Sequence, residues 1–499
     1  MLYKKKINES NEFEIRKKKF LKIYKNKFNF PNNFKSNITI KKINKKYINY
    51  TKEELLKINI NFNITGRIIK QRIMGKASFI IIRELLEEIQ IYVTEKKISS
   101  EFYNNEFKKW DIGDIVAVQG KIFKTKTEQL SIYCSVIILL SKSLRPLPEK
   151  FHGLHNQEIR YRKRYLDLLS NKNIMKNFII RSKILNIIRN FMNHNKFIEV
   201  ETPMMQNIPG GANAKPFITH HNSLNINMYL RISPELYLKR LIIGGFTKIY
   251  EINRNFRNEG ISKKHNPEFT MMELYIAYAN YKDLMKFIIK LIKNITKKIN
   301  KNYQIKYQEY IFDINKPFKI LTMKNAILYY NKNIKKNELN NINKIKKITQ
   351  LYNIPIKKKW TIEKIIVKIF KETTENKLIQ PTFITEFPTE VSPLARKKNN
   401  NKKIVERFEF FIGGMEIGNG FSELNDPKDQ KKRFLKQTNN KNQLKNKISF
   451  YDSEYIEALE YGMPPTAGLG IGIDRLIMIM TNQKNIKDVI LFPTLKPII

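Results

Sequence analysis

The stretch from Lys248 to Tyr278 constrains the fold of this chain more than any other part of the sequence. It predicts two strands joined by a polar loop at residues 258–267. Successive side chains of a strand point to opposite faces. The return strand therefore has small or apolar side chains on one face, and on the other it has a mixed set of Phe269, Met271, Glu273 and Tyr275. A solvated polar face would explain this set, and so would a pocket for an aromatic base and a charged group.

Basic residues dominate the composition: 93 Lys and Arg stand against 45 Asp and Glu, which gives a net charge of +48. Such an excess indicates a polyanionic partner such as nucleic acid, since each neutralised phosphate releases counterions. Lys, Asn and Ile can all be encoded with A and T alone, however, so an AT-rich genome would produce much of the same bias. The charge therefore supports nucleic-acid binding only weakly.

Two kinds of protein are excluded by composition. A single cysteine, Cys134, excludes a disulfide framework and any cysteine-based zinc site. The start of the chain has no apolar signal region, and no apolar run approaches the roughly 18 residues that span a bilayer. We therefore expect a soluble, cytoplasmic protein that does not enter a membrane.

The sequence divides into four parts. Residues 1–55 are rich in Lys and Asn and predict a basic, partly helical N-terminal extension. Residues 56–143 contain short alternating strands, which predict a small all-β barrel of the five-stranded nucleic-acid-binding type. A proline-containing segment opens a linker at 144–172, and the remaining domain covers residues 173–499, with an insertion at about 303–380.

Basic and aromatic residues interleave along the predicted barrel. Arg72, Phe79 and Gln90 are of the types that stack on single-stranded bases or hydrogen-bond to them. Phe79 also fits a core position, and the strand pattern alone favours the core.

A second motif, RFEFFIGGMEIGNGFSEL, predicts a hairpin that turns at Gly413 and Gly414. In that register Glu409 and Glu416 are diagonal neighbours on one face, where two like charges repel each other. A magnesium ion between them would explain the arrangement, and two solvated surface glutamates would be the alternative. Strict alternation places Asn419, Phe421 and Glu423 on the opposite face from Glu416, unless a bulge at Gly418 or Gly420 turns them back.

A third motif, GLGIGIDRLIMIM, has three alternating glycines ahead of an apolar helix. Residue 473 is Ile where a dinucleotide-binding fingerprint needs glycine, and no Walker A sequence occurs in the chain. The pattern instead predicts a strand along which a ligand can lie close to the backbone, with Arg475 at the junction between strand and helix.

Together these motifs resemble a known family. FIEVETPMM, FRNEG with HNPEFTMMELY, and GLGIGIDR are similar to motifs 1, 2 and 3 of class II aminoacyl-tRNA synthetases. The stretches PGGANAKPFITHHN, ELYLKRL and QPTFITEFPTEVSPLAR single out the lysyl-tRNA synthetases of the bacterial type. The resemblance covers the chain from about Ile58 to its end. It implies an α+β protein with a five-stranded OB-type barrel and a catalytic domain built on an antiparallel sheet flanked by helices.

The resemblance implies a role for each matching residue. Catalysis would depend on Arg257 and Arg475. The ATP site would consist of Arg257, Glu259, His265, Asn266, Phe269, Glu409 and Arg475. The lysine site would consist of Gly211, Glu235, Glu273, Tyr275, Asn419, Phe421 and Glu423. Magnesium would be held by Glu409 and Glu416, and the anticodon would be read by Arg72, Phe79 and Gln90.

The implied activity is the joining of lysine to tRNA in two steps, through a lysyl-adenylate. The implied partners are ATP, L-lysine, tRNA(Lys) and a second copy of the chain in a homodimer. Mg²⁺ would bind with ATP, and neither zinc nor an organic cofactor is expected.

Three alternatives remain on sequence grounds. An aspartyl or asparaginyl synthetase would share the barrel and the catalytic core, but its pocket would offer cations or amides rather than glutamates. A paralogue that modifies a protein would lack the barrel. A decayed tRNA-binding protein would have lost some of the residues Arg257, Glu409, Glu416 and Arg475, and all four are present.

The chain departs from the family pattern at three places. Lys196 replaces the glycine that usually precedes Phe197, and the barrel turn at residues 83–88 contains no glycine. Met415 stands where a basic residue is usual. We expect the first two to affect stability or the shape of the anticodon loop, and the third to border the active site and alter phosphate contacts.

Overall fold

The computed structural model describes residues 2–25, 29–148, 156–357, 360–442 and 451–498. The chain divides into two compact units, Met1–Lys176 and Asn177–Ile499. Among the described residues, no helix is both long enough and apolar enough to cross a membrane.

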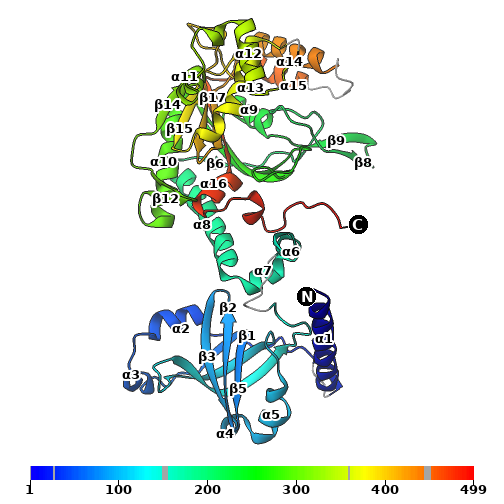
Figure 1. The fold of residues 1–499 in the computed structure, drawn as a ribbon, viewed down its shortest axis with the longest axis vertical. Helices are drawn as coiled ribbons and strands as arrows, with labels where there is room; N and C mark the ends of the chain where they lie inside the picture. Colours follow the sequence, from blue (N-terminus) through cyan, green and yellow to red (C-terminus); the bar gives the residue numbers. More distant parts are fainter. Residues whose placement is uncertain (1, 26–28, 149–155, 358–359, 443–450, 499) are drawn as a thin grey trace. The chain divides into compact units, whose positions relative to one another are not determined.

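The first unit contains a closed barrel with the strand order β1-β2-β3-β5-β4 (Figure 1). Its strands are β1 (Phe62–Met74), β2 (Ala77–Glu84), β3 (Glu87–Thr94), β4 (Ile115–Lys124) and β5 (Leu130–Ser141). Its helices are α1 (Leu2–Lys25), α2 (Ile40–Tyr47), α3 (Lys52–Leu56), α4 (Glu95–Ile98), α5 (Ser100–Asn105), α6 (Gln157–Arg162) and α7 (Arg164–Ser170). The five-stranded barrel predicted from the sequence is confirmed.

The core of the barrel begins well before its first strand. Ile40, Ile43 and Tyr47 of α2 and Leu55 of α3 are buried in the same apolar cluster as the strands. Helix α1 packs Ile23 against the same cluster, and its Arg16 donates hydrogen bonds to the carbonyl oxygens of Ile112 and Ser143. The N-terminal 55 residues are therefore partly built into the barrel unit.

The second unit is organised around an eight-stranded sheet with the order β14-β15-β16-β17-β18-β11-β10-β6. The neighbours from β15 to β10 are antiparallel, and the outer pairs β14–β15 and β6–β10 are parallel. The strands are β6 (Ile198–Glu199), β10 (Lys248–Phe256), β11 (Glu268–Ala277), β14 (Lys319–Thr322), β15 (Thr382–Thr385), β16 (Arg407–Ile412), β17 (Met415–Ser422) and β18 (Thr466–Gly472).

The remaining elements of this unit are smaller sheets and helices. The strands are β7 (Met205–Gln206), β8 (Ile218–His221), β9 (Ile226–Leu230), β12 (Gln304–Tyr307) and β13 (Tyr310–Asp313). The helices are α8 (Lys172–His194), which begins in the first unit, α9 (Glu235–Ile243), α10 (Tyr281–Asn300), α11 (Met323–Tyr330), α12 (Ile342–Leu351), α13 (Ile362–Thr373), α14 (Pro427–Asn442), α15 (Ser453–Glu460) and α16 (Ile473–Met480).

One face of the large sheet forms the main core. Alternate residues of β11 and β18, such as Met272, Leu274 and Leu469, point to this face and pack against the helices α8, α10 and α16. Helix α10 begins at a capping box in which Asn280 and Asp283 each accept a hydrogen bond from the other's backbone N–H. Because helices fill this face, the residues that alternate with the core positions point to the opposite face of the sheet. That open face is where a functional site can form.

Candidate functional site

Residues from four neighbouring strands form one row across the open face of the sheet. Glu273 on β11 lies opposite Gly470 on β18, Gly470 lies opposite Asn419 on β17, and Asn419 lies opposite Glu409 on β16. The row includes three side chains that the sequence had placed in a site. The face predicted for Phe269, Met271, Glu273 and Tyr275 is therefore a pocket wall rather than a solvated surface.

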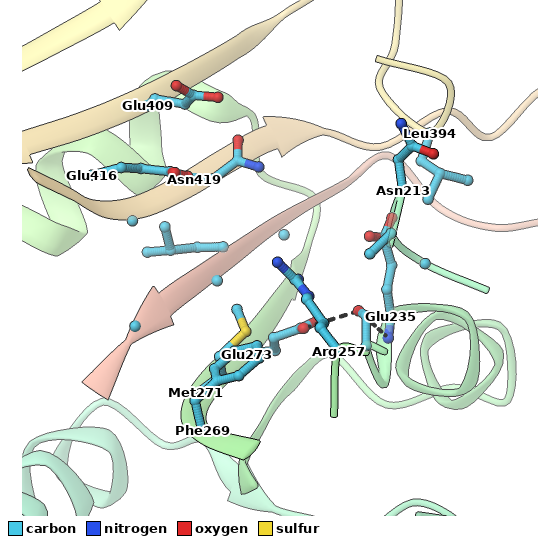
Figure 2. Close-up of a pocket in the computed structure, with 18 of the residues that line it drawn as sticks. Asn213, Glu235, Arg257, Phe269, Met271, Glu273, Leu394, Glu409, Glu416 and Asn419 are labelled. Carbon is cyan, nitrogen blue, oxygen red and sulfur yellow. Dashed lines mark hydrogen bonds between the residues drawn. The ribbon is translucent and has the colours of Figure 1, made fainter. Parts of the chain in front are cut away.

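A cavity of about 580 Å³ lies over this face. Of the residues predicted for the ATP, lysine and metal sites, it is lined by Gly211, Glu235, Arg257, Glu259, His265, Asn266, Phe269, Glu273, Tyr275, Glu409, Glu416, Asn419, Phe421 and Arg475. Figure 2 shows the labelled carboxylates around this space, three from the strands β11, β16 and β17 and Glu235 from helix α9, with Arg257 among them. Glu423 is not among the lining residues, and it lies behind the wall.

The hairpin β16–β17 has the turn predicted from its two glycines, but it also contains a bulge. Phe411 pairs with Glu416, whereas Phe410 pairs with Gly418, so Ile417 is an extra residue that faces the core. The bulge returns Asn419 and Phe421 to the same face as Glu416. Strict alternation, which placed them on the opposite face, is wrong here, and the irregularity lies one residue before Gly418.

Glu409 and Glu416 share the open face, as the diagonal register predicted. Burial and, second, the neighbouring charge of Glu416 raise the pKa of Glu409 to about 7. Glu409 also forms an ion pair with Arg407, whose nitrogen lies 2.6 Å from the carboxylate oxygen. The described residues contain no group of three or more His, Cys, Asp or Glu side chains that could hold a metal ion by themselves. Two carboxylates supply hard oxygen ligands that suit Mg²⁺ when phosphate and water oxygens complete its shell.

Two arginines lie at the polar end of the cavity. The Arg257 guanidinium lies 5.1 Å from the centre of the Phe269 ring, and burial lowers its pKa. Arg475 lies 2.9 Å from Nε2 of His265 and donates a hydrogen bond to the carbonyl oxygen of Glu416. Arg475 therefore connects the loop at 258–267 to the hairpin.

The opposite end of the cavity is acidic and buried. Ser233 Oγ donates a hydrogen bond of 3.0 Å to Glu273, and Tyr275 lies beside the same carboxylate. Burial, together with the charge of Glu235, raises the pKa of Glu273 to about 8. Burial also raises the pKa values of Glu235, Tyr275 and Glu423. An ammonium group placed among these side chains would lower their electrostatic energy.

Sequence reasoning missed Lys239, which lies behind this acidic end. Its side chain is fully buried, and Nζ donates a 2.7 Å hydrogen bond to Glu235 and contacts the carboxylate of Glu423. The spacing of Glu235 and Lys239, four residues apart on one helix, was a signal for their contact. Nothing in the local pattern indicated Glu423 as the second partner.

The alternating glycines of β18 form the floor of the cavity. A Cβ at Gly468 would lie 2.1 Å from Oε1 of Glu423 and 2.5 Å from the Tyr275 ring. A Cβ at Gly470 would lie 3.1 Å from the end of Met271. The prediction that a ligand can lie close to this strand is consistent with its place in the cavity wall.

The structure shows where each of the three departures from the family pattern lies. Met415 is buried in the main core and does not line the cavity, so the expectation that it borders the active site is wrong. Lys196 has a left-handed backbone with a φ of 61°, a conformation that favours glycine. In the glycine-free barrel turn, Leu85 adopts a φ of 55°.

The barrel carries a separate row of aromatic rings on its outer face. Phe79 lies between the buried residues Ser78 and Ile80 and stacks on Tyr92 with ring centres 4.8 Å apart. Tyr92 stacks in turn on Tyr133. The core position that the pattern favoured for Phe79 is therefore wrong.

Arg72 and Gln90 flank this row of rings. Arg72 is opposite Phe79 on the neighbouring strand and is exposed. Gln90 donates a hydrogen bond of 3.1 Å to Ser131 Oγ. All three residues predicted to contact bases thus lie on one face of the barrel.

Both parts of the chain match known families. Residues 156–496 match the family "tRNA synthetases class II (D, K and N)", and residues 62–140 match "OB-fold nucleic acid binding domain". Among similar proteins, a lysine–tRNA ligase of Buchnera aphidicola subsp. Schizaphis graminum is 60% identical over 97% of this chain and 96% of its own length. The lysine–tRNA ligase of Photorhabdus laumondii subsp. laumondii is 53% identical over 98% of this chain and 97% of its own length.

Proposed function

The chain belongs to the lysine–tRNA ligases, which are class II tRNA synthetases, and we propose how its cavity carries out their reaction. The enzyme activates L-lysine with ATP and transfers the lysyl group to the 3′ end of tRNA. The observation that supports our assignment of the site is its polarity: arginines lie at one end of a single cavity and buried carboxylates at the other. The anionic reacting groups fit the first end, and the ammonium groups of lysine fit the second.

The acidic end also favours lysine over aspartate and asparagine, the other two amino acids of this synthetase family. An aspartyl or asparaginyl synthetase needs cations or amide groups around a short acidic or amide side chain. Here Glu235, Glu273 and Glu423 are all nearly fully buried. A fourth carboxylate, from the side chain of aspartate, would meet strong repulsion among these three without solvent to screen it.

We assign the two ends of lysine to separate residues. Glu273, Tyr275 and Glu423 would receive the ε-ammonium, and Phe421 would pack against the aliphatic stem. Gly211 and Glu235 would take the α-ammonium, while Asn419 would contact the α-carboxylate. The glycine floor supports this assignment because an extended side chain needs the space that Gly468 and Gly470 leave open.

The nucleotide would occupy the opposite end. Phe269 would stack on adenine, with Arg475 on the far side of the ring and near the terminal phosphates. Glu259, His265 and Asn266 come from the loop at 258–267, which Arg475 already contacts. These assignments place the α-phosphorus of ATP close to Arg257.

In the first step the α-carboxylate of lysine attacks the α-phosphorus of ATP, and pyrophosphate leaves. Both reactants are anions, so the barrier falls mainly through alignment and through fixed positive charge. Arg257 would bridge the carboxylate and the α-phosphate, and its burial strengthens that interaction. No side chain has to act as a nucleophile.

Glu409 and Glu416 would hold Mg²⁺ together with the phosphates of ATP. When bound, the ion would neutralise negative charge on the phosphate oxygens. The two carboxylates fit this role because they share one face and repel each other in its absence. Arg407, paired with Glu409, would keep that carboxylate directed at the cavity.

The second step transfers the lysyl group to the terminal adenosine hydroxyl of tRNA(Lys). We propose that the barrel selects this tRNA by its anticodon, with Phe79 as a stacking platform and Arg72 and Gln90 as polar contacts. We also propose that the enzyme works in the cytoplasm as a homodimer, as the resemblance of its first class II motif implies.

Amino-acid-dependent ATP–pyrophosphate exchange tests the assignment directly. Lysine should support exchange, and aspartate and asparagine should not. Glu273→Gln should weaken lysine binding far more than ATP binding, because only the ammonium needs the charge. Exchange with aspartate, or no exchange with lysine, would contradict the proposed function, and equal losses for both substrates would contradict the role of Glu273.

A further inference from the structure

Lys239 connects two carboxylates that the proposed function assigns to opposite ends of the substrate. It belongs to α9, is fully buried, and donates a 2.7 Å hydrogen bond to Oε1 of Glu235 one helical turn earlier. The same Nζ contacts Oε2 of Glu423, which follows strand β17. A single ammonium therefore joins an α-helix to the sheet at the base of the cavity.

The second oxygen of Glu423 is directed toward the cavity floor. Oε1 is buried and has no hydrogen-bond partner among the residues that the structure describes. It lies 2.1 Å from the position that a Cβ of Gly468 would take, and Gly468 lines the cavity. The absence of a side chain at Gly468 therefore leaves Oε1 next to the space for the substrate.

Glu235 is arranged in the same way. Oε1 is held by Lys239, while the residue itself lines the cavity beside Gly211 and Ser233. Each carboxylate can thus bind Lys239 through one oxygen and a substrate ammonium through the other, since a carboxylate has about four acceptor sites.

The charges at this end agree with a substrate that carries two ammonium groups. Glu235, Glu273 and Glu423 would together carry three negative charges, and Lys239 contributes one positive charge. The ionised site is therefore two positive charges short of balance, and lysine supplies two at its α- and ε-positions, while its α-carboxylate would be neutralised by Arg257. Buried charges are tolerated when they are paired.

We propose that Lys239 is a positioning residue that ties Glu235 and Glu423 to one ammonium and so fixes the spacing between the sites for the α- and ε-ammonium groups of lysine. This inference rests on the proposed function. Its consequence is selectivity for chain length, because ornithine is one methylene shorter than lysine and cannot span two fixed carboxylates equally well. Methylene packing alone would reject ornithine by only about 10- to 200-fold.

Lys239→Met tests the proposal, because Met has a similar length and no charge. Lysine-dependent exchange should show a KM for lysine raised about 10- to 100-fold, the loss typical of a charged hydrogen bond. The KM for ATP should stay within about twofold of its original value. The ratio of kcat/KM for ornithine to that for lysine should rise, because carboxylates that are no longer tied can approach a shorter substrate.

Lys142→Met is a matched control. Lys142 is also a fully buried lysine that bridges two carboxylates, Asp111 and Asp114, but it belongs to the barrel unit. This variant should lower the melting temperature and leave both the lysine KM and the ornithine ratio unchanged. An effect of Lys239→Met that matched this control would show a structural role only and would overturn the proposal.

Lys239→Arg provides a second test of the proposal if the Met variant does not fold. It retains the charge, but the wider guanidinium changes the spacing of the two carboxylates. The ornithine ratio should therefore change while the KM for ATP does not, and an unchanged ratio with an unchanged lysine KM would overturn the proposal. The unaltered enzyme is measured first: if it shows no exchange with lysine, the proposed function fails, whereas a normal enzyme with indifferent Lys239 variants contradicts this inference alone.

Discussion

The proposed lysine site should bind its substrate with an affinity that depends on pH near neutrality. Burial, followed by the charge of Glu235, raises the pKa of Glu273 from an ordinary 4.5 to about 8, against the opposing effects of the Ser233 hydrogen bond and Arg257. The other charged or titratable groups around it are Glu251, Tyr275 and Glu423, and Glu423 is itself paired with Lys239. In the empty enzyme at pH 7, Glu273 is therefore mostly protonated.

A substrate ammonium needs the ionised carboxylate, so binding must first remove this proton. With a pKa of about 8, about 1% of Glu273 is ionised at pH 6 and about half at pH 8. The affinity for lysine should therefore increase about 50-fold between these pH values and level off above pH 8. The raised pKa values of Glu235 and Glu423 act in the same direction and would steepen the change.

The raised pKa of Glu273 also makes the stability of the folded enzyme depend on pH. Stability should fall as pH rises, whereas the affinity for lysine should increase. Below pH 4.5 Glu273 is protonated in both the folded and the unfolded chain, so the stabilising contribution of the proton is fully present. Between pH 4.5 and 8 only the folded chain keeps the proton, so stability falls as pH rises through this range. Lysine should consequently stabilise the enzyme most at the alkaline end, where the carboxylate is charged and unpaired.

Isothermal titration calorimetry at pH 6.0 to 8.5 measures this dependence. Repeating each titration in two buffers with different ionisation enthalpies counts the protons released, and about one should leave at pH 7. Glu273→Gln is the control: its weaker affinity should change much less with pH. A dissociation constant for lysine that is constant from pH 6 to 8, or a Glu273→Gln variant with the same slope as the original enzyme, would contradict a proton on Glu273 that lysine must displace.

Three further predictions concern single positions. Gly468→Ala should raise the KM for lysine about tenfold or more in the exchange assay, because the new Cβ collides with Glu423; an unchanged KM would show that the floor is not used. Phe79→Ala should reduce kcat/KM for tRNA about 5- to 150-fold through lost base stacking, while exchange without tRNA stays unchanged; a loss of exchange would contradict its role. Lys196→Gly should raise the free energy of unfolding by about 1 kcal/mol in urea titrations, and a loss of stability would show that the left-handed backbone is not strained.

The face of the return strand could be predicted because its period is fixed. Side chains of β11 alternate without interruption from Glu268 to Ala277, and its partners β10 and β18 keep one register along it. Alternation therefore assigned Phe269 and Glu273 to one side without any knowledge of the neighbours. The two-glycine turn of β16 and β17 was predictable for the same reason, since it sets the pairing of the residues next to it.

The bulge at Ile417 could not be predicted from the period of the strand. A bulge is a mismatch between two strands, so it depends on what the partner offers at that point and not on the period of one strand. Phe408 and Phe410 face the core on β16, and the extra residue lets Ile417 reach the same core while Asn419 returns to the cavity. The nearby Gly418 and Gly420 indicated an irregular strand but not its position.

Phe79 and Lys239 show a second limit of prediction from sequence periodicity. Alternation in β2 divides its residues into two sets, but only the closed barrel decides which set is inside, and there Ile80 and Ile82 take the core. For Lys239, the helix period indicated Glu235 as a partner, whereas Glu423 approaches from a strand far along the chain. Contacts made by tertiary packing leave no period in the sequence.

The departures from the family pattern indicate which positions of this chain tolerate substitution. Lys196 and Leu85 both hold left-handed backbone that costs a residue with a side chain about 1–2 kcal/mol, but neither lines the cavity. At Gly468, by contrast, a Cβ would lie 2.1 Å from Oε1 of Glu423, the carboxylate that we propose binds the substrate. We infer that replacements at turns lower stability by small amounts that add up across the chain, whereas replacements on the glycine floor weaken the binding of lysine directly. Ligands that bind only the folded enzyme should therefore offset much of the strain at the turns.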